Sequence, residues 1–413
     1  MKVLLSAYSC EPGMGSERGV GWNIVREVAR YHEVWVLTRP DESRDAIEAE
    51  LARNPIPNLH FVYFTLPFWQ DSRKWGQSGG MQIHYYLWQI QAYFVARKLH
   101  RQIEFDLIHH VTFVKYSSPS FLTLLPVPFI WGPIGGGESA PKAFWQDFGF
   151  KAKAYERARN LTRWLGELDP FVRYTARNSS AIRATTEDTA QRLYQIGADA
   201  NKVEILSQLG LSEAEISDLA QYQMPDDVPI RFISIGRLLH WKGFHLGIRA
   251  FHEANLANTE YWIVGEGFEL ERLQSLAWDL GIADRVKFCG SLSRQETLST
   301  LASCHVLVHP SLHDSGGMVC MEAMAAGRPV ICLDLGGPAV QVTDKTGFKI
   351  KAHTPQQAVS DLATAMIQLS GDRELRNRLS QAGKQQVRQN YSWQIFGDRL
   401  NRLYTAIVKQ KNY

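Results

Sequence analysis

Short apolar runs rich in β-branched and aromatic residues recur along the chain, and longer helical patterns separate them. This alternation is typical of βα units that build a parallel sheet. The runs fall into two successive series, and we predict a strand from each run. The first series covers residues 2–8, 34–38, 60–64, 106–110, 128–131, 181–184 and 203–206. The second covers residues 230–235, 261–264, 286–288, 305–309, 330–333 and 347–350. Two such series predict an α/β protein with two doubly wound sheets.

The strand pattern is interrupted after residue 207 by Gly210, a polar stretch and a Met-Pro-Asp-Asp turn at 224–227. We therefore predict a first domain over residues 1–207 and a second over 208–390. Residues 391–413 carry apolar side chains at helical spacing, which predicts an amphipathic helix that must pack on another part of the chain. Ligands bind beyond the carboxyl ends of strands in such sheets, so two facing sheets predict a site in a central cleft.

Composition excludes several function classes. The 413 residues include 45 Lys and Arg against 42 Asp and Glu, and this near balance excludes the global positive field of a nucleic-acid binder. The N-terminal sequence MKVLLSAYSCEPG has too short an apolar run for a signal peptide, and no run approaches the length of a spanning helix. The sequence predicts a cytoplasmic protein that does not require a membrane, and it leaves open attachment to a membrane surface.

The segment from 313 to 331 runs from a strand end through a glycine turn into a helix and the next strand. Gly316 leaves the backbone bare beside two acids, Asp314 in the loop and Glu322 inside the helix. We predict that Glu322 accepts hydrogen bonds from ribose hydroxyls and Asp314 from sugar hydroxyls. Unpaired N–H groups at a helix start suit phosphate. Here they belong to Gly317, Met318 and Val319.

A second loop of the same kind follows the strand at 230–235. It starts at Gly236 and carries Arg237 and Lys242, five residues apart. Two cations at this spacing are suited to hold a diphosphate and to neutralise the charge that develops on it as it leaves. Further glycine turns follow two later strands, at Gly265-Glu266-Gly267 and Gly290-Ser291-Leu292. Together these loops predict one nucleotide pocket, with residues 290–294 giving backbone contacts to the base.

These motifs resemble those of the family 4 retaining glycosyltransferases of the GT-B fold. The resemblance rests on Gly236-Arg237…Lys242-Gly243, Gly265-Glu266-Gly267, Gly290 and Asp314-x7-Glu322, in this order, and covers essentially the whole chain. It implies two Rossmann-like domains, a nucleotide-activated sugar donor that is commonly a UDP-sugar, and no obligatory metal or other cofactor. It also implies that the helix in residues 391–413 crosses back to the N-terminal domain. The chain departs from the family pattern in two places, because Asp314 replaces the usual first Glu and Gly316 stands where an aromatic residue is common.

The glycine-rich loop after the first strand is placed by the resemblance beside the donor diphosphate and the acceptor. It includes Gly15, and Glu17 and Arg18 follow it. These two charged residues either contact the acceptor or pair with each other. The sequence leaves both roles open.

Two histidines, His109 and His110, end the strand at 106–110. Adjacent strand residues point to opposite faces, so one histidine reaches a ligand and the other packs inside. The resemblance implies that a histidine at this loop touches the donor sugar. The sequence does not decide between the two.

The acceptor side of the predicted site involves Gly135 and Gly136, which follow another strand, and two cations, Lys115 and Arg183. The cations would hold an acidic group such as a sugar phosphate, or would be ordinary solvated side chains. A basic stretch with interleaved apolar residues at 151–177 fits either an interfacial helix for a lipid-borne acceptor or a solvated face.

The expected activity is transfer of a hexosyl group, with glucose the first candidate, from a UDP-sugar to an acceptor hydroxyl with retention. In a front-face mechanism, Arg237 and Lys242 stabilise the departing diphosphate. Two acceptor classes compete: a sugar phosphate such as fructose 6-phosphate, as in sucrose-phosphate synthases, and a polysaccharide or lipid-linked glycan, as in exopolysaccharide enzymes. A nucleotide-sugar epimerase or hydrolase of the same fold is the alternative from a different class.

Overall fold

The computed structural model of the chain describes residues 1–71, 80–226 and 228–411. The chain divides into two compact units. The first unit contains Met1–Gly137, Arg159–Gly210 and Trp393–Tyr413, and the second contains Glu138–Ala158 and Leu211–Ser392. Asn412 and Tyr413, the last residues of the predicted C-terminal segment, lie outside the described residues.

The first unit is built on a seven-stranded sheet in which all neighbouring strands are parallel. The strand order is β3-β2-β1-β4-β5-β6-β7, so the direction of winding reverses between β1 and β4. The strands are β1 (Lys2–Ala7), β2 (Glu33–Thr38), β3 (Leu59–Tyr63), β4 (Leu107–Thr112), β5 (Phe129–Ile134), β6 (Ala181–Ala184) and β7 (Val203–Ile205). The helices are α1 (Ser16–Ala29), α2 (Pro40–Arg53), α3 (Met81–Ile103), η2 (Phe121–Leu124), α5 (Pro170–Asn178), α6 (Glu187–Gln195), η4 (Ala200–Lys202) and α15 (Trp393–Lys411).

The second unit has a six-stranded parallel sheet in the order β10-β9-β8-β11-β12-β13, which reverses between β8 and β11. Its strands are β8 (Ile230–Ile235), β9 (Thr259–Val264), β10 (Val286–Gly290), β11 (Val306–His309), β12 (Val330–Leu333) and β13 (Gly347–Ile350). Its helices are η3 (Lys142–Asp147), α7 (Glu213–Ala220), η5 (His240–Lys242), α8 (Phe244–Ala254), α9 (Leu270–Asp279), α10 (Arg294–Ala302), α11 (Met318–Ala325), α12 (Gly336–Gln341), α13 (Pro355–Gly371) and α14 (Arg373–Asn390).

The predicted α/β class with two Rossmann-like sheets is confirmed. Each of the thirteen predicted strands overlaps a strand of the structure, and the ends agree to within two residues except that β5 ends three residues later than predicted. The strands are nearly continuous apolar runs because helices cover both faces of a parallel sheet.

A segment from the middle of the sequence belongs to the second unit. Phe144 and Phe148 are buried in the same core cluster as Phe232 and Phe251 of that unit. The boundary between the units then falls inside α4 (Phe150–Leu168), after Ala158. This assignment gives the second unit nine residues of α4, including one acidic side chain that reaches the site described below.

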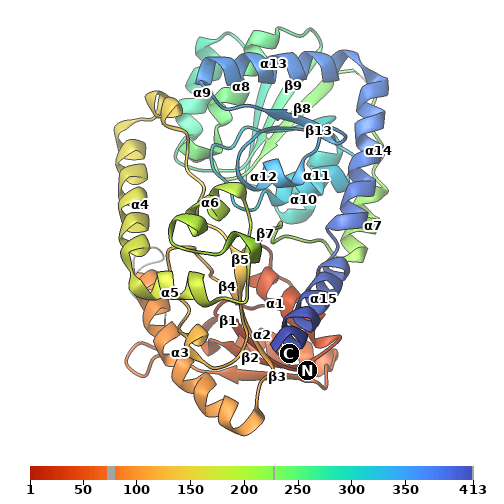
Figure 1. Cartoon of the computed structure of the whole chain (residues 1–413). Coiled ribbons are helices and arrows are strands. Elements are labelled where there is room, and N and C mark those ends of the chain that lie inside the picture. The colour runs from red at the N-terminus through yellow and green to blue at the C-terminus, as the bar shows by residue number, and fades with distance from the viewer. Residues whose placement is uncertain (72–79, 227, 412–413) are drawn as a thin grey trace. The chain divides into compact units, whose positions relative to one another are not determined.

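The C-terminal helix α15 packs against α1 in the first unit (Figure 1). Its apolar face buries Trp393, Phe396, Leu400 and Tyr404, the positions that the helical spacing marks in the sequence. The helix therefore completes the first unit although its sequence follows the second. None of the described helices combines the length and the apolar character needed to cross a membrane.

Candidate functional site

The winding reversal in the second unit brings together two loops that carry charged side chains. β8 and β11 are neighbours in the sheet, and each is followed by one of these loops, at residues 236–243 and 310–317. Connections leave such a reversal in opposite directions, which opens space for a ligand at the carboxyl ends of the two strands. The predicted residues Arg237, Lys242 and Asp314 all lie in these two loops.

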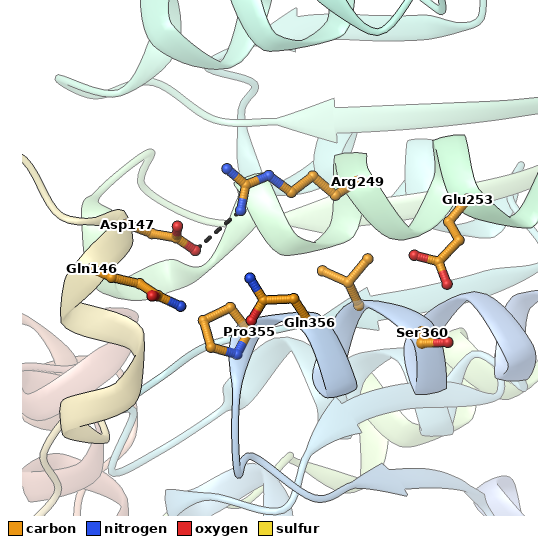
Figure 2. A pocket seen from close by; sticks show the side chains of 8 residues that line it. Gln146, Asp147, Arg249, Glu253, Pro355, Gln356 and Ser360 are labelled. Carbon is orange, nitrogen blue, oxygen red and sulfur yellow. Dashed lines mark hydrogen bonds and ion pairs between the residues drawn. The ribbon is translucent and has the colours of Figure 1, made fainter.

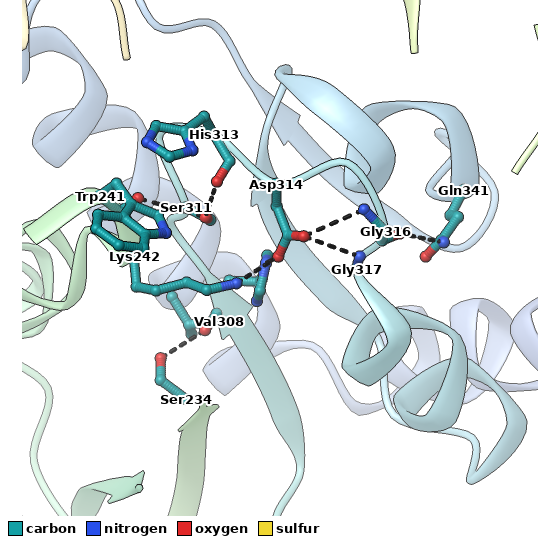
Figure 3. A network of polar contacts seen from close by, with 11 residues as sticks. Ser234, Trp241, Lys242, Val308, Ser311, His313, Asp314, Gly316, Gly317 and Gln341 are labelled. Carbon is teal, nitrogen blue, oxygen red and sulfur yellow. Dashed lines mark hydrogen bonds and ion pairs between the residues drawn. The ribbon is translucent and has the colours of Figure 1, made fainter. Parts of the chain in front are cut away.

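Lys242 and Asp314 form the centre of this site. Nζ of Lys242 lies 2.5 Å from Oδ2 of Asp314 (Figure 3). Nε2 of His309 lies 3.3 Å from the same oxygen. The other oxygen, Oδ1, accepts hydrogen bonds from the backbone N–H groups of Gly316 and Gly317. Burial opposes the charge on Asp314, but the hydrogen bond from His309 and the charge of Lys242 hold the pKa of its carboxyl far below the ordinary value. Asp314 is therefore a fixed anion that already orders its loop.

Arg237 differs from Lys242 because its side chain is exposed and makes no hydrogen bond or ion pair within the parts of the chain that the structure describes. It lies five residues before Lys242 in the same loop. The loop thus offers one unengaged guanidinium and one ammonium that has only a single carboxylate partner. An incoming polyanion can meet both without breaking a larger network.

Glycines allow the loops of this site to pack closely on one another. Gly243 has φ +68°, and a Cβ at this position would lie 1.9 Å from the carbonyl oxygen of Pro310 in the facing loop. Gly265 and Gly267 have positive φ as well, and they pack against the backbone of Gly236 and Leu238. The predicted glycine turns are therefore brought together at the carboxyl edge of the sheet, where their first role is contact between loops.

Glu322 lies on α11, one helical turn from the glycine turn that starts this helix. Its side chain is 7% exposed, and Oε1 accepts a hydrogen bond from Arg294 at 2.6 Å. Burial raises the pKa of Glu322, and the charge of Arg294 opposes that rise. The second terminal nitrogen of Arg294 binds Glu215 of α7 at 2.9 Å.

Arg294 is a member of this site that sequence reasoning missed. It is the first residue of α10, and neither adjacent residue is a glycine or an acid that would indicate a binding role for it. Nearby, Ser291 is exposed and Leu292 is half-buried, and the N–H of Ser291 points to Oε1 of Glu266 at 3.4 Å. The predicted base-binding turn and the predicted ribose ligand thus lie on neighbouring elements joined through Arg294.

In the first unit, the glycine-rich loop and helix α1 meet the loop that follows β4. The carboxylate of Glu17 accepts a hydrogen bond from the backbone N–H of Phe113, whose φ of +61° is unusual for a bulky residue. Desolvation raises the pKa of Glu17. Arg18 pairs instead with Glu11 across the loop at 2.8 Å, so Glu17 and Arg18 do not pair with each other. Gly15 is exposed at the start of α1.

His109 and His110 are adjacent residues of β4, so their side chains point to opposite faces of the sheet, and both are fully buried. His109 hydrogen-bonds the hydroxyl of Tyr404 on α15 and the carbonyl of Gly132. His110 lies 3.1 Å from the hydroxyl of Tyr85 on α3. Burial lowers the pKa of each histidine to about 3, so both are neutral at physiological pH. Both ring nitrogens of His109 and Nε2 of His110 therefore contact protein groups.

Lys115 lies in a different environment from Arg183. The strand-like pairing of Lys115 with Gly135 places its side chain next to Gly136, which has φ +95°. Burial and the charges of Arg159 and Arg163 lower the pKa of Lys115, while Glu17 opposes this shift. The loop after β4, the glycine segment after β5 and helix α4 therefore bring several cations together.

Arg183 is buried on β6, and its guanidinium lies over the ring of Phe396 on α15, 4.7 Å from the ring centre. Its acidic neighbour is Glu204, at 3.8 Å. The structure does not bring Arg183 to the cations around Lys115. Its position under α15 gives it a packing role in the first unit.

No group of three or more His, Cys, Asp or Glu side chains in the described residues could hold a metal ion.

Two family models together match most of the chain. Residues 219–386 match the model of glycosyl transferases group 1, and residues 15–207 match that of the glycosyl transferase 4-like domain. The chain is 30% identical over 245 residues to the lipopolysaccharide core biosynthesis glycosyltransferase LpsE of Rhizobium meliloti, covering 59% of this chain and 69% of that protein. It is 31% identical over 183 residues to a D-inositol 3-phosphate glycosyltransferase of Corynebacterium jeikeium, covering 42% of each.

Solved structures share the fold at low sequence identity. The sucrose-phosphate synthase of Thermosynechococcus elongatus matches with a TM-score of 0.68 and 18% identity over 99% of both chains. The lipopolysaccharide outer core galactosyltransferase WaaB, in its apo form, matches with a TM-score of 0.66 and 14% identity, covering 98% of this chain and all of that one.

Proposed function

Because this chain belongs to the group 1, family 4 glycosyltransferases of the GT-B fold, we propose that it moves a hexosyl group from a UDP-sugar to an acceptor hydroxyl with retention of configuration. The second unit binds the donor, and the first unit binds the acceptor. Glucose is the first candidate for the transferred sugar. One of the structural neighbours, Anabaena HepE, has been solved with UDP-glucose, which supports this choice of donor.

The observation that carries the proposal is the pair of cations in the loop after β8. The side chain of Arg237 makes no hydrogen bond or ion pair among the described residues, and the ammonium of Lys242 pairs with Asp314. A diphosphate supplies the negative charge that both side chains can bind. Its oxygens compete with Asp314 for Lys242, and the freed carboxylate can then accept hydrogen bonds from sugar hydroxyls.

The proposed step breaks the bond between the anomeric carbon and the diphosphate oxygen, and forms a bond from the acceptor oxygen to the same carbon. The acceptor attacks from the face that the diphosphate leaves, and its hydroxyl proton passes to a phosphate oxygen. Arg237 and Lys242 stabilise the charge that collects on the departing diphosphate. Glu322 binds the ribose hydroxyls and holds the nucleoside in place. No metal or other cofactor is required in this scheme.

For the acceptor we propose first a small phosphorylated sugar such as fructose 6-phosphate. Lys115, with Arg159 and Arg163 as electrostatic neighbours, supports an acidic group on the acceptor. Two of the similar proteins point the same way, since one carries inositol phosphate in its name and another is a sucrose-phosphate synthase. Arg183, buried under α15, takes no part in this version of the proposal.

A lipid-linked or polymeric glycan is the second candidate acceptor, and surface helices of the first unit favour it. In this unit, α4 and α5 expose the large apolar side chains of Leu161, Trp164, Leu165, Leu168, Phe171 and Tyr174. Arg173 and Arg177 are exposed on α5 beside them. Apolar side chains with flanking cations are the combination that binds anionic membrane surfaces. The similarity to a lipopolysaccharide core enzyme supports the same acceptor class.

Product analysis tests the proposal and separates it from the epimerase or hydrolase alternative. The purified chain is incubated with UDP-glucose alone and with UDP-glucose plus fructose 6-phosphate, and UDP and sugar products are identified by NMR. Acceptor-dependent formation of an α-linked product supports retaining transfer to a sugar phosphate. Equal UDP release without an acceptor would instead identify a hydrolase, and conversion of UDP-glucose to an epimeric UDP-sugar would identify an epimerase. UDP-glucose binding without turnover, together with sedimentation on anionic vesicles, would favour the lipid-linked acceptor.

A further inference from the structure

Glu156 of α4 is a buried acid that joins the two loops of the donor site. Its side chain is 1% exposed. Its Oε1 accepts a hydrogen bond from Nε2 of His240 at 3.0 Å and another from Nε2 of His313 at 3.1 Å. Both histidines are buried. A buried carboxylate is costly unless it is well hydrogen-bonded, so this three-residue arrangement is strongly determined.

The two histidines are sequence neighbours of the residues that do the proposed chemistry. His240 lies in η5, two residues before Lys242, and His313 directly precedes Asp314. One oxygen of Glu156 is thus bonded to the loop after β8 and to the loop after β11. The separation of Lys242 and Asp314 depends on the separation of these loops.

Stacked rings and backbone contacts reinforce the same junction. Tyr155 stacks on Trp241 with ring centres 5.2 Å apart, and Trp241 stacks on His313 at the same distance. The carbonyl of Trp241 accepts a hydrogen bond from the N–H of Leu312 at 2.8 Å. Figure 3 shows Trp241, Ser311 and His313 on the side of Lys242 away from the glycine turn. Adjacent residues of α4, Tyr155 and Glu156, therefore contact both loops at once.

We infer that Glu156 is a positioning residue for the donor diphosphate: it fixes the two loops through His240 and His313 so that Lys242 is held where the diphosphate binds. This inference rests on the proposed function. Glu156 does not touch the donor in this account. Glu156 acts on the reaction only through the positions of the two loops. We therefore expect its replacement to reduce the donor affinity and the transfer rate more than it reduces the stability of the fold.

Two variants of Glu156 test this role. Glu156→Ala removes both hydrogen bonds, and we expect UDP affinity measured by calorimetry to fall about tenfold and kcat/KM to fall by about 10- to 100-fold, since small displacements of binding groups have effects of this size. Glu156→Gln keeps an oxygen that accepts from both histidines and should restore both values to within about threefold of the wild type. Melting temperatures of all variants are recorded in parallel.

Asp147→Ala is the matched control. Asp147 is an acid from the same 138–158 segment, and it binds His245 at 3.5 Å and Arg249 at 3.1 Å, both on α8. It lies beside a pocket formed by η3, α8 and α13, as Figure 2 shows, and not at the donor loops. We expect Asp147→Ala to lower the melting temperature while UDP affinity stays at the wild-type value.

The outcomes separate this inference from the proposed function. If the wild type binds UDP and transfers sugar but Glu156→Ala matches it in both, the positioning role is wrong and the proposed function stands. If the wild type neither binds UDP nor turns over a UDP-sugar, the proposed function itself fails. Should Glu156→Ala not fold, His240→Phe and His313→Phe each remove one of the two bonds. Reduced UDP affinity in both supports the inference, and unchanged affinity overturns it.

Discussion

Nζ of Lys242 lies 2.5 Å from Oδ2 of Asp314, and each side chain is 18% exposed. The two residues are far apart in the sequence but meet where the winding of the second sheet reverses. The pair keeps an anion and a cation ready at the place where the donor's diphosphate and sugar are proposed to bind. When the donor binds, its diphosphate is proposed to replace Asp314 as the partner of Lys242.

Replacing Lys242 by Met is expected to reduce kcat/KM for UDP-sugar by about 10²-fold, because a preorganised charge at the leaving group is lost. UDP release under initial-rate conditions measures this. Lys351→Met is the control, since Lys351 forms an ion pair of the same 2.5 Å length with Asp334 on the surface. Equal activity of Lys242→Met and Lys351→Met would show that Lys242 does not stabilise the leaving diphosphate.

Removing Arg294 is expected to make UDP binding depend on pH. Burial raises the pKa of Glu322, and Arg294 counteracts that rise. In Arg294→Ala the pKa of Glu322 rises further, so its carboxylate is lost at a higher pH as the solution is acidified. As the pH is lowered, the UDP affinity of the variant should therefore start to fall at a higher pH than that of the wild type. Calorimetric titrations at three pH values measure the difference, and parallel curves would contradict it.

The first unit should lose stability as the pH falls below the ordinary value for histidine. His109 and His110 have pKa values of about 3 in the folded state because they are buried. Between about pH 6.5 and pH 3 the unfolded chain binds more protons than the folded one, so the free energy of unfolding decreases with decreasing pH. Each histidine contributes a slope of up to about 1.4 kcal/mol per pH unit. Urea unfolding at pH 7, 6 and 5 measures the slope.

His110→Gln removes one of these titrating groups and keeps a polar side chain beside Tyr85. We expect the decrease between pH 6.5 and pH 5 to be shallower in this variant than in the wild type. An unchanged slope would show that His110 does not titrate on unfolding in this range.

Gly243→Ala is expected to disrupt the donor site. The residue has φ +68°, and a Cβ would lie 1.9 Å from the carbonyl oxygen of Pro310, so the two loops must move apart. The strained backbone alone costs about 1 kcal/mol, and the contact adds to this. Melting temperature and UDP affinity should both decrease. Gly371→Ala is the control, because a Cβ there meets no atom within 4 Å. Similar losses in both variants would contradict the close-approach argument.

Much of the fold could be predicted because the strands of parallel sheets are locally encoded. Each apolar run, such as 230–235 or 330–333, carries its own signal, and the glycines that follow mark where a strand ends. The loops that carry the binding motifs could be predicted for the same reason. Arg237, Lys242 and Asp314 lie in loops that follow strands identified by the pattern.

Features that depend on long-range packing could not be predicted in this way. Nothing local marks Phe144 and Phe148 as core residues of the second unit, yet they carry the 138–158 segment into it. Glu156 and Arg294 likewise look like ordinary helix-surface residues in the sequence. Their partners, His240 and His313 for one and Glu322 for the other, are between 28 and 157 positions away.

Arg183 is a further residue whose role depends on long-range packing. A lone arginine in a strand carries no local sign of whether it faces a ligand or the interior. Its position under Phe396 is set by α15, whose sequence begins more than 200 residues later. Long-range packing of this kind decides which of several cations remain available to an acceptor.

The effect of Arg237→Ala on UDP release from UDP-glucose in the presence of fructose 6-phosphate tests most directly whether the loop after β8 holds the departing diphosphate. Arg237 is exposed and has no partner in the described residues, so its removal should leave the melting temperature unchanged. We expect a wild-type rate that depends on the acceptor and a decrease of about 10²-fold in the variant. A variant as active as the wild type would contradict the proposal that the loop after β8 holds the departing diphosphate.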